Sequence, residues 1–142
     1  MANSAICNSS RTSLENVGSS ILVTGGAGFI GMHTCLELKR RGFNPIALDN
    51  MNDYYSTQLK KDRVAILREA GIDIVYGNVC DEDLLVRTIR NHSIDRVIHL
   101  AAQAGVTYSI QFPHSYTENN VNCFISILET FVKEHLVLKP LI

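Results

Sequence analysis

The chain has 142 residues, of which 46% are hydrophobic and 19% charged, and its formal net charge is −1. This length and composition are typical of a single globular domain with its own core. A near-neutral charge gives no basic footprint for nucleic acid or an anionic membrane surface, and no apolar run reaches the roughly 18 residues of a membrane span. We therefore expect one domain that binds neither nucleic acid nor membrane.

Residues 1–20 are rich in serine and asparagine and have almost no apolar periodicity. Because no apolar stretch follows a basic start, the pattern is not that of a secretory signal. We interpret this segment as a disordered leader and assign the folded domain to residues 21–142.

The four cysteines are far apart in the sequence and show no C-x-x-C spacing: Cys7, Cys35, Cys80 and Cys123. In a chain without a secretory signal, this pattern favours free, mostly buried thiols in a reducing compartment. We therefore expect a cytoplasmic protein with neither a disulfide nor a metal site.

Short apolar runs alternate with segments of helical period from Ile21 onward. The apolar runs predict strands at 21–24, 46–49, 72–76 and 96–101, with the beginning of a fifth at 136–142. Helices are expected from the first turn to about 41, at 57–70, from 81 past 89, and at 115–135. This alternation predicts an α/β fold of the Rossmann type, a doubly wound parallel sheet truncated at about four to five strands with helices on both faces. Such sheets bind ligands beyond the carboxyl ends of their strands.

The turn after the first expected strand carries four glycines, Gly25, Gly26, Gly28 and Gly31, which satisfy both G-x-G-x-x-G and G-x-x-G-x-x-G spacing. Glycine is needed at such a turn because the chain bends tightly, its backbone approaches a pyrophosphate, and the next helix packs on the strand. The N-terminus of that helix then faces the phosphate charge. An ordinary glycine turn is the alternative, and the strand–turn–helix context disfavours it.

Asp49 closes the second expected strand, 18 residues beyond Gly31. An acidic residue at this place can accept hydrogen bonds from the ribose hydroxyls of an adenosine and would repel a 2′-phosphate. No arginine directly follows Asp49 to reverse that preference. The sequence therefore favours NAD over NADP.

Candidate contact residues also follow the third and fourth expected strands. Asn78 and Val79 come after the third strand, and residues 100–103 come after the fourth. Small residues at 101, 102 and 104 would let the backbone approach a cofactor closely. We interpret His99, inside the fourth strand, as a core histidine with hydrogen-bond partners and no catalytic role.

Three segments together resemble a known family: T-G-G-A-G-F-I-G at 24–31, L-D-N-M-N-D-Y-Y at 48–55 and H-L-A-A-Q-A-G-V at 99–106. They are similar to the extended short-chain dehydrogenase/reductase family, specifically its NAD-dependent nucleotide-sugar epimerases and dehydratases. The last two segments look most like the UDP-glucuronate 4-epimerases. The resemblance covers residues 21–142.

The resemblance implies a reversible hydride shuttle on a nucleotide sugar, with UDP-glucuronate as the substrate. NAD takes a hydride from C4 of the sugar and returns it to the other face of a 4-keto intermediate. By position, the resemblance implies that the cofactor is held by Gly25, Gly28, Phe29, Ile30, Gly31, Asp49, Asn50, Asn78, Val79, Leu100, Ala101, Ala102, Gln103 and Asn120, the last opening the family's N-x-x-G motif.

The sequence departs from the family pattern at several places. Cys123 replaces the glycine of N-x-x-G, Asn78 stands where the family usually has aspartate, and Thr107 stands where glucuronate epimerases commonly have arginine. No tyrosine has a lysine four residues later, so the family's Y-x-x-x-K proton-transfer pair is absent from these residues. We therefore expect no catalytic residue in this chain and no turnover by it.

Three interpretations remain open. The chain is the N-terminal part of a UDP-sugar 4-epimerase, or a non-catalytic dinucleotide-binding fragment that forms a homodimer or pairs with a full-length homologue, or an unstable product with an exposed sheet edge. A dehydratase acting on dTDP-glucose is less favoured, because segments 52–55 and 102–106 fit it less well.

Overall fold

The computed structural model describes residues 18–134, so the expected fifth strand and most of the expected leader lie outside the described residues. Four parallel strands form one sheet in the order β3-β2-β1-β4. Their bounds are β1 Ser20–Thr24, β2 Asn44–Asp49, β3 Asp73–Tyr76 and β4 Ile94–His99. The strand order reverses at β1, which pairs with both β2 and β4. The first strand thus starts within the segment expected to be a leader.

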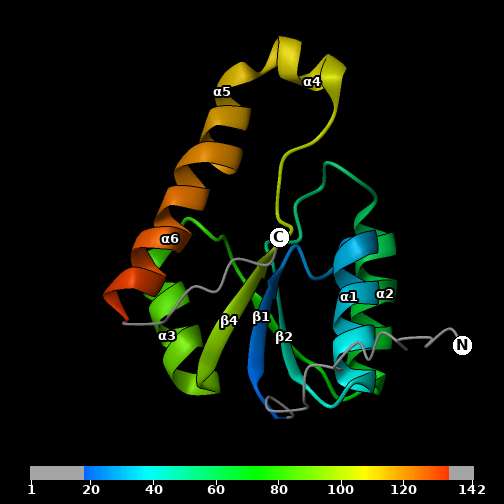
Figure 1. The fold of residues 1–142 in the computed structure, drawn as a ribbon. Helices are drawn as coiled ribbons and strands as arrows, with labels where there is room; N and C mark the ends of the chain where they lie inside the picture. The colour runs from blue at the N-terminus through cyan, green and yellow to red at the C-terminus, as the bar shows by residue number, and fades with distance from the viewer. Residues whose placement is uncertain (1–17, 135–142) are drawn as a thin grey trace, which may run out of the picture.

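Four helices cover the two faces of the sheet (Figure 1). Helices α1 (Phe29–Arg40) and α2 (Thr57–Glu69) lie on one face, and α3 (Glu82–His92) and α6 (Cys123–Lys133) lie on the other. This arrangement confirms the prediction of a doubly wound parallel sheet. No helix within residues 18–134 is long and apolar enough to cross a membrane.

The core consists of two apolar clusters, one on each face of the sheet. Alternate residues of β1 point to opposite faces, as strand geometry requires. Ile21 and Val23 pack with Met32 and Cys35 of α1 in one cluster. Leu22 packs in the other cluster, among residues of β2, α3 and α6. The buried β1 therefore holds the following turn in a fixed position.

The segment between β4 and α6 differs from its prediction. The sequence predicts one helix over 115–135, but the helical run begins at α4 (Val106–Gln111). It continues through α5 (Pro113–Thr117) and the π-helix η1 (Glu118–Asn122) into α6. Phe112 leaves helical geometry between α4 and α5, with φ −132°, because proline disfavours the α conformation at the residue before it. The helices α4 and α5 stand beyond the carboxyl ends of the strands (Figure 1).

Candidate cofactor site

A cavity lies at the carboxyl ends of the strands, where the strand order reverses. Its wall is built from the glycine turn, the end of β2, the loop after β3 and the segment after β4. Ten of the residues predicted to hold a cofactor line it: Gly25, Gly28, Asp49, Asn50, Asn78, Val79, Leu100, Ala101, Ala102 and Gln103.

The glycine turn opens α1 in a geometry suited to an anion. Gly28 is the N-cap residue of α1, and within the described chain no side chain caps this helix. Its first turn contains no acidic residue, whereas α3 is capped by the Asp81 carboxylate, which accepts the Leu84 N–H at 2.9 Å. The free N–H groups at the start of α1 therefore remain available for a negatively charged ligand.

Close packing makes glycine necessary in this turn. A Cβ on Gly31 would lie 2.1 Å from the Gly25 carbonyl oxygen, and one on Gly25 would lie 2.9 Å from the Ala101 nitrogen. The Gly28 N–H donates to that same Gly25 oxygen at 2.9 Å. The turn is thus wedged between α1 and the segment after β4.

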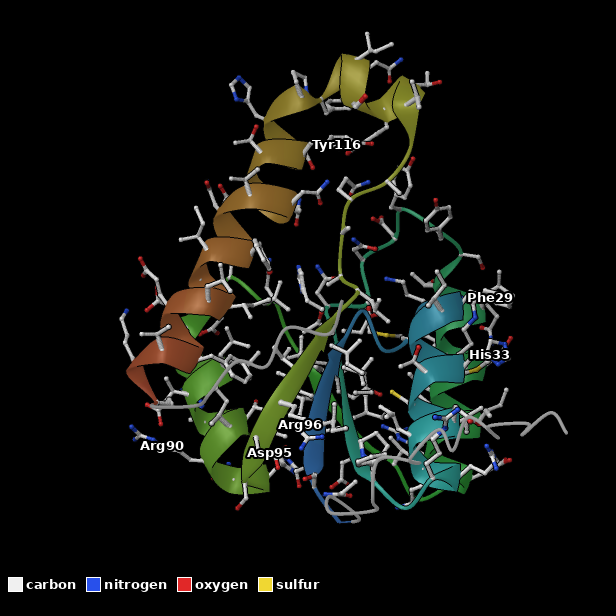
Figure 2. All side chains as sticks on the ribbon, viewed as in Figure 1. Phe29, His33, Arg90, Asp95, Arg96 and Tyr116 are labelled. Atoms are coloured by element: carbon white, nitrogen blue, oxygen red, sulfur yellow. A yellow bond between two sulfur atoms is a disulfide. The ribbon has the colours of Figure 1, made fainter. Side chains whose placement is uncertain are left out.

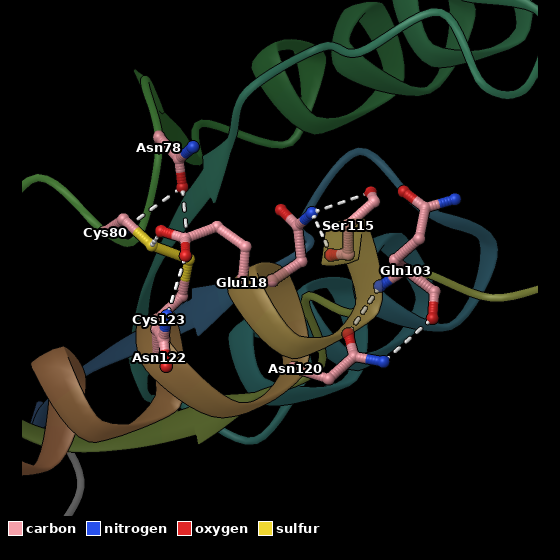
Figure 3. The surroundings of a disulfide bond; sticks show 9 residues. Asn78, Cys80, Gln103, Ser115, Glu118, Asn120, Asn122 and Cys123 are labelled. Atoms are coloured by element: carbon pink, nitrogen blue, oxygen red, sulfur yellow. Dashed lines mark hydrogen bonds between the residues drawn. A yellow bond between two sulfur atoms is a disulfide. The ribbon is translucent and has the colours of Figure 1, made fainter. Parts of the chain in front are cut away.

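Four residues of the predicted set do not line the cavity. Phe29 and Ile30 are each 65% exposed at the start of α1, and the Phe29 ring packs edge-on against His33 of the same helix (Figure 2). Gly31, in the first turn of α1, packs against Gly25 and Gly26 of the glycine turn. Asn120 acts on the backbone: its Oδ1 accepts the Gln103 N–H at 2.7 Å, and its Nδ2 donates to the Gln103 carbonyl at 3.0 Å (Figure 3). Direct contact of these four with a cofactor stays a prediction.

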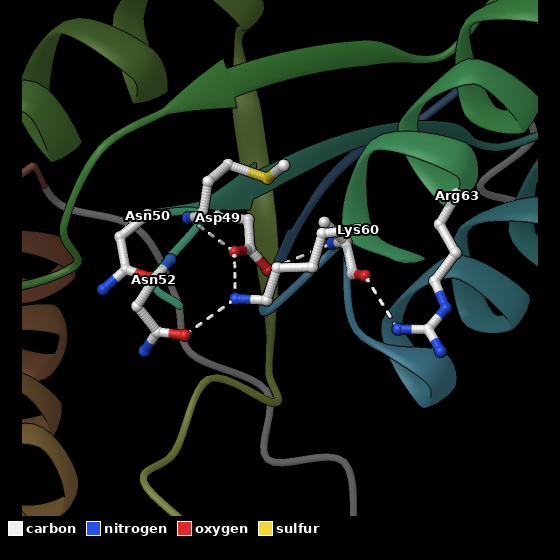
Figure 4. A network of polar contacts seen from close by, with 7 residues as sticks. Asp49, Asn50, Asn52, Lys60 and Arg63 are labelled. Carbon is white, nitrogen blue, oxygen red and sulfur yellow. Dashed lines mark hydrogen bonds and ion pairs between the residues drawn. The ribbon is translucent and has the colours of Figure 1, made fainter. Parts of the chain in front are cut away.

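Asp49 is held by a polar network that joins β2, the glycine turn and α2 (Figure 4). Its side chain is only 5% exposed. One carboxylate oxygen accepts the Ala27 N–H at 3.1 Å, and the other accepts the Met51 N–H at 2.9 Å and a proton of Lys60 Nζ at 3.1 Å. Lys60 also donates to Asn52 Oδ1 at 2.9 Å. A carboxylate has about four acceptor positions, so one position of Asp49 has no described partner and can accept from a ligand hydroxyl.

Lys60 and five other cavity residues lie outside the set predicted from the sequence. Lys60 lies eleven residues beyond Asp49 in α2, where it occupies the same buried i, i+4, i+7 stripe as Val64 and Leu67. A lysine at this place in an apolar stripe is the signal that could have found it, and the packing of α2 brings its ammonium to Asp49. The other five come from β2, from loops and from η1: Leu48, Asn52, Tyr54, Tyr55 and Asn119.

A side-chain pair joins the ends of β1 and β4 beneath the cavity. Thr24 Oγ1 accepts the N–H groups of Leu100 and Ala101, both at 3.1 Å, and lies 2.7 Å from Nδ1 of His99. With its two acceptor positions used, the threonine hydroxyl donates its proton to an unprotonated Nδ1. His99 also stacks on Phe124 with 5.5 Å between ring centroids. The structure thus gives His99 the hydrogen-bond partner that the sequence predicts, but places it half-buried at the end of β4 and outside the two core clusters.

We expect His99 to make folding stability depend on pH. Burial lowers the pKa of His99 below its ordinary 6.5, and the Thr24 hydroxyl aimed at Nδ1 opposes protonation further. The unfolded chain takes up this proton as the pH falls below about 6.5, whereas the folded chain resists it. Its contribution to stability is therefore complete above that pH and is lost as the pH falls towards the folded pKa.

The measurement is urea unfolding at pH 7.5 and pH 5.5. The wild-type chain should lose more free energy of unfolding between these values than a His99→Gln variant. A His114→Gln variant, changed at an exposed position of α5, should lose as much as the wild type. An equal pH dependence in the wild type and His99→Gln would contradict the assignment.

The expectation that all cysteines are free thiols is wrong. Cys80, in the loop after β3, forms a disulfide with Cys123, the first residue of α6 (Figure 3). The two residues are 43 positions apart, and the fold brings their Cα atoms to 4.4 Å. Within residues 18–134, Cys80, Glu118 and Cys123 are the one cluster with metal-ligand spacing, but its two sulfurs are bonded to each other. Cys35 is free and buried.

Comparison with known proteins agrees with this geometry. The family model described as GDP-mannose 4,6 dehydratase matches residues 22–139. UDP-glucuronate 4-epimerase 4 of Arabidopsis thaliana is 49% identical over 119 residues, which are 84% of this chain and 27% of that protein. Protein CapI of Staphylococcus aureus is 39% identical over 77% of this chain and 33% of its own.

Solved structures show the same fold. The UDP-glucose 4-epimerase of Bifidobacterium longum, in complex with NAD+ and UDP, has a TM-score of 0.69 and 32% identity over 83% of this chain and 35% of its own. The enzyme of Stenotrophomonas maltophila, with bound NAD and formylated UDP-arabinopyranose, has a TM-score of 0.73 and 29% identity over 83% of this chain and 34% of its own. The chain spans about a quarter to a third of the length of these relatives.

Proposed function

Because this chain belongs to the GDP-mannose 4,6 dehydratase family, we propose that it is the NAD-binding part of a nucleotide-sugar 4-epimerase. The observation that carries the proposal is the strand-end cavity, which brings together an uncapped glycine turn and a buried carboxylate. The glycine turn fits a pyrophosphate, and Asp49 fits the ribose hydroxyls of an adenosine. The donor and acceptor sets therefore match the two halves of an adenosine diphosphate.

Each part of the chain has a separate task in this proposal. The N–H groups that open α1 bind the pyrophosphate, and the free acceptor position of Asp49 binds a ribose hydroxyl. Gln103, pinned through its backbone by Asn120, fixes the segment after β4 against the ligand. When bound, NAD supplies a hydride acceptor that removes and returns the hydrogen at C4 of the sugar. The chain's own contribution is binding and orientation.

The substrate class in the proposal is a UDP-sugar, with interconversion of UDP-glucuronate and UDP-galacturonate as the reaction. Its support is the 49% identity to an Arabidopsis UDP-glucuronate 4-epimerase and the L-D-N-M-N-D-Y-Y segment, whose Tyr54 and Tyr55 line the cavity. We place the protein in the cytoplasm, as a protein of nucleotide-sugar metabolism.

The proposal is tested with the purified 142-residue chain. We expect isothermal titration calorimetry to show weak, saturable binding of NAD, and we expect no conversion of UDP-glucuronate, since no tyrosine has a lysine four residues later. A Gly28→Val variant is the control, because a Cβ at Gly28 meets the Gly25 oxygen at 2.9 Å. Absence of NAD binding would overturn the proposed cofactor. Robust turnover of UDP-glucuronate would overturn the proposal that this chain contributes only binding and orientation.

A second candidate function is association with a full-length homologue. Helix α6 exposes apolar side chains, among them Phe124, Ile125 and Val132, and within residues 18–134 β4 pairs with β1 alone. A tagged chain should then retain a co-expressed full-length homologue in a pull-down. No retention, with both proteins soluble, would remove this candidate.

A further inference from the structure

The disulfide joins two segments that each carry part of the cofactor cavity (Figure 3). On one side, Cys80 directly follows Asn78 and Val79, which line the cavity. On the other, Cys123 directly follows η1, which contributes Asn119 to the wall and Asn120 to the Gln103 backbone. The sulfur–sulfur bond therefore connects the loop after β3 with the helix that supports the segment after β4.

Asn78 lies between the disulfide and the cavity. Its side-chain oxygen accepts the Cys80 N–H at 3.0 Å and lies 3.8 Å from the Cys123 sulfur. A change in the separation of the two sulfurs therefore acts directly beside the contacts that hold this amide. Two unbonded sulfurs require van der Waals separation, which for heavy atoms is about 3.5–4 Å, so reduction moves the sulfurs apart and removes the covalent link between the loop and the helix.

The two sulfurs differ in their access to solvent. Cys80 is half-buried, whereas Cys123 is fully buried, so an external thiolate can reach the bond from the Cys80 side. The exposed Glu118 carboxylate lies 3.8 Å from the Cys80 sulfur, and a like charge disfavours a thiolate there. Cys35 is a natural contrast, because burial raises the pKa of its thiol to about 12 and leaves it unreactive.

We propose that Cys80 and Cys123 form a redox-modification site that controls the affinity of the cavity for its dinucleotide. The proposal rests on the proposed NAD site. In the oxidised chain, the bond holds Asn78 and η1 in the geometry that accepts the cofactor. In the reduced chain, the two segments separate and affinity falls.

The exchange partner is a thiol of the glutathione or dithiol-oxidoreductase class. Its thiolate attacks the Cys80 sulfur and forms a mixed disulfide, while the Cys123 sulfur leaves and takes up a proton. A second partner thiolate then releases Cys80. The bond accepts two electrons and two protons in total, and the partner is oxidised to its own disulfide.

The experiment compares oxidised and reduced chain in a Cys7→Ser background, titrated with NAD. We expect dithiothreitol to weaken NAD binding by about fivefold or more, with the far-UV circular dichroism spectrum retained. Peptide mapping of the oxidised chain should find Cys80 and Cys123 cross-linked, and a thiol reagent should label Cys80 only after reduction. A Cys123→Ser variant should show the weaker affinity with and without dithiothreitol, and Cys35→Ala should respond like the parent.

The outcomes separate the two proposals. If neither redox state binds NAD, the proposed function fails. If both states bind NAD equally, or peptide mapping finds no cross-link, the redox site fails while the proposed function stands. Complete unfolding in dithiothreitol would show that the disulfide is required for folding. It would likewise overturn the proposal that the disulfide controls the affinity for NAD.

Discussion

Replacing Gly31 by alanine is expected to weaken NAD binding by about fivefold to a hundredfold, although Gly31 does not line the cavity. The new Cβ would lie 2.1 Å from the Gly25 carbonyl oxygen and 2.8 Å from its carbonyl carbon. Such an overlap is relieved only by moving the turn away from α1, and overpacking of this kind costs about 1–3 kcal/mol. Since about 1.4 kcal/mol corresponds to a tenfold change in affinity, the expected loss is large.

The turn has little room to move in response. On its other side, Gly25 already packs against the backbone of Leu100 and Ala101, and the Gly26 N–H donates to the Leu48 carbonyl at 3.1 Å. Displacement of the turn therefore disturbs three walls of the cavity together. Calorimetry with NAD gives the affinity, and urea unfolding gives the cost in stability.

A Gly71→Ala variant provides a matched control. Gly71 follows α2 at φ +66°, and no described atom lies within 4 Å of the place its Cβ would take. Alanine in this left-handed conformation costs about 1–2 kcal/mol, similar to the Gly31 variant, but far from the cavity. Equal NAD affinity in both variants would show that Gly31→Ala acts through general destabilisation and not through the turn.

The glycine turn and Asp49 could be placed from the sequence because their signals are local. A glycine spacing directly after an apolar run, followed by a helical period, specifies the turn. The rule that parallel strands present ligand sites at their carboxyl ends then gathers residues 78–79 and 100–103 at one edge. The structure places all of these residues around one cavity.

Long-range pairings could not be obtained in this way. Lys60 meets Asp49, and Cys80 meets Cys123, only after helices α2 and α6 have docked on opposite faces of the sheet. Cys80 and Cys123 are 43 positions apart and form no recognisable motif. The sequence therefore favoured free thiols. The start of α4 was missed because its apolar residues, Val106 and Ile110, are exposed and form no buried face.

An Asp49→Asn variant is expected to shift the relative affinity of the cavity from NAD towards NADP. The substitution removes a charged hydrogen-bond acceptor for the ribose, and hydrogen bonds to charged groups contribute about 1.5–3 kcal/mol. NAD affinity should therefore fall by about tenfold to a hundredfold. The same substitution removes the negative charge that repels a 2′-phosphate.

Lys60 decides whether the variant gains NADP affinity or only loses NAD affinity. Its Nζ lies 3.1 Å from Asp49 Oδ1 and is largely shielded from water. Without the Asp49 charge, this ammonium faces the cavity with only neutral described partners, and a 2′-phosphate would restore an anion beside it. A double variant, Asp49→Asn with Lys60→Met, should lose the gain in NADP affinity.

The comparison needs NAD and NADP titrations of the wild type, Asp49→Asn, the double variant, and a Lys61→Met control. Lys61 is the exposed neighbour on α2, so its loss should change neither affinity. NADP binding that is equally improved in the single and double variants would show that removal of repulsion alone sets the preference. NADP binding improved only where Lys60 remains would identify the buried Asp49–Lys60 pair, and not Asp49 alone, as the element that selects the cofactor.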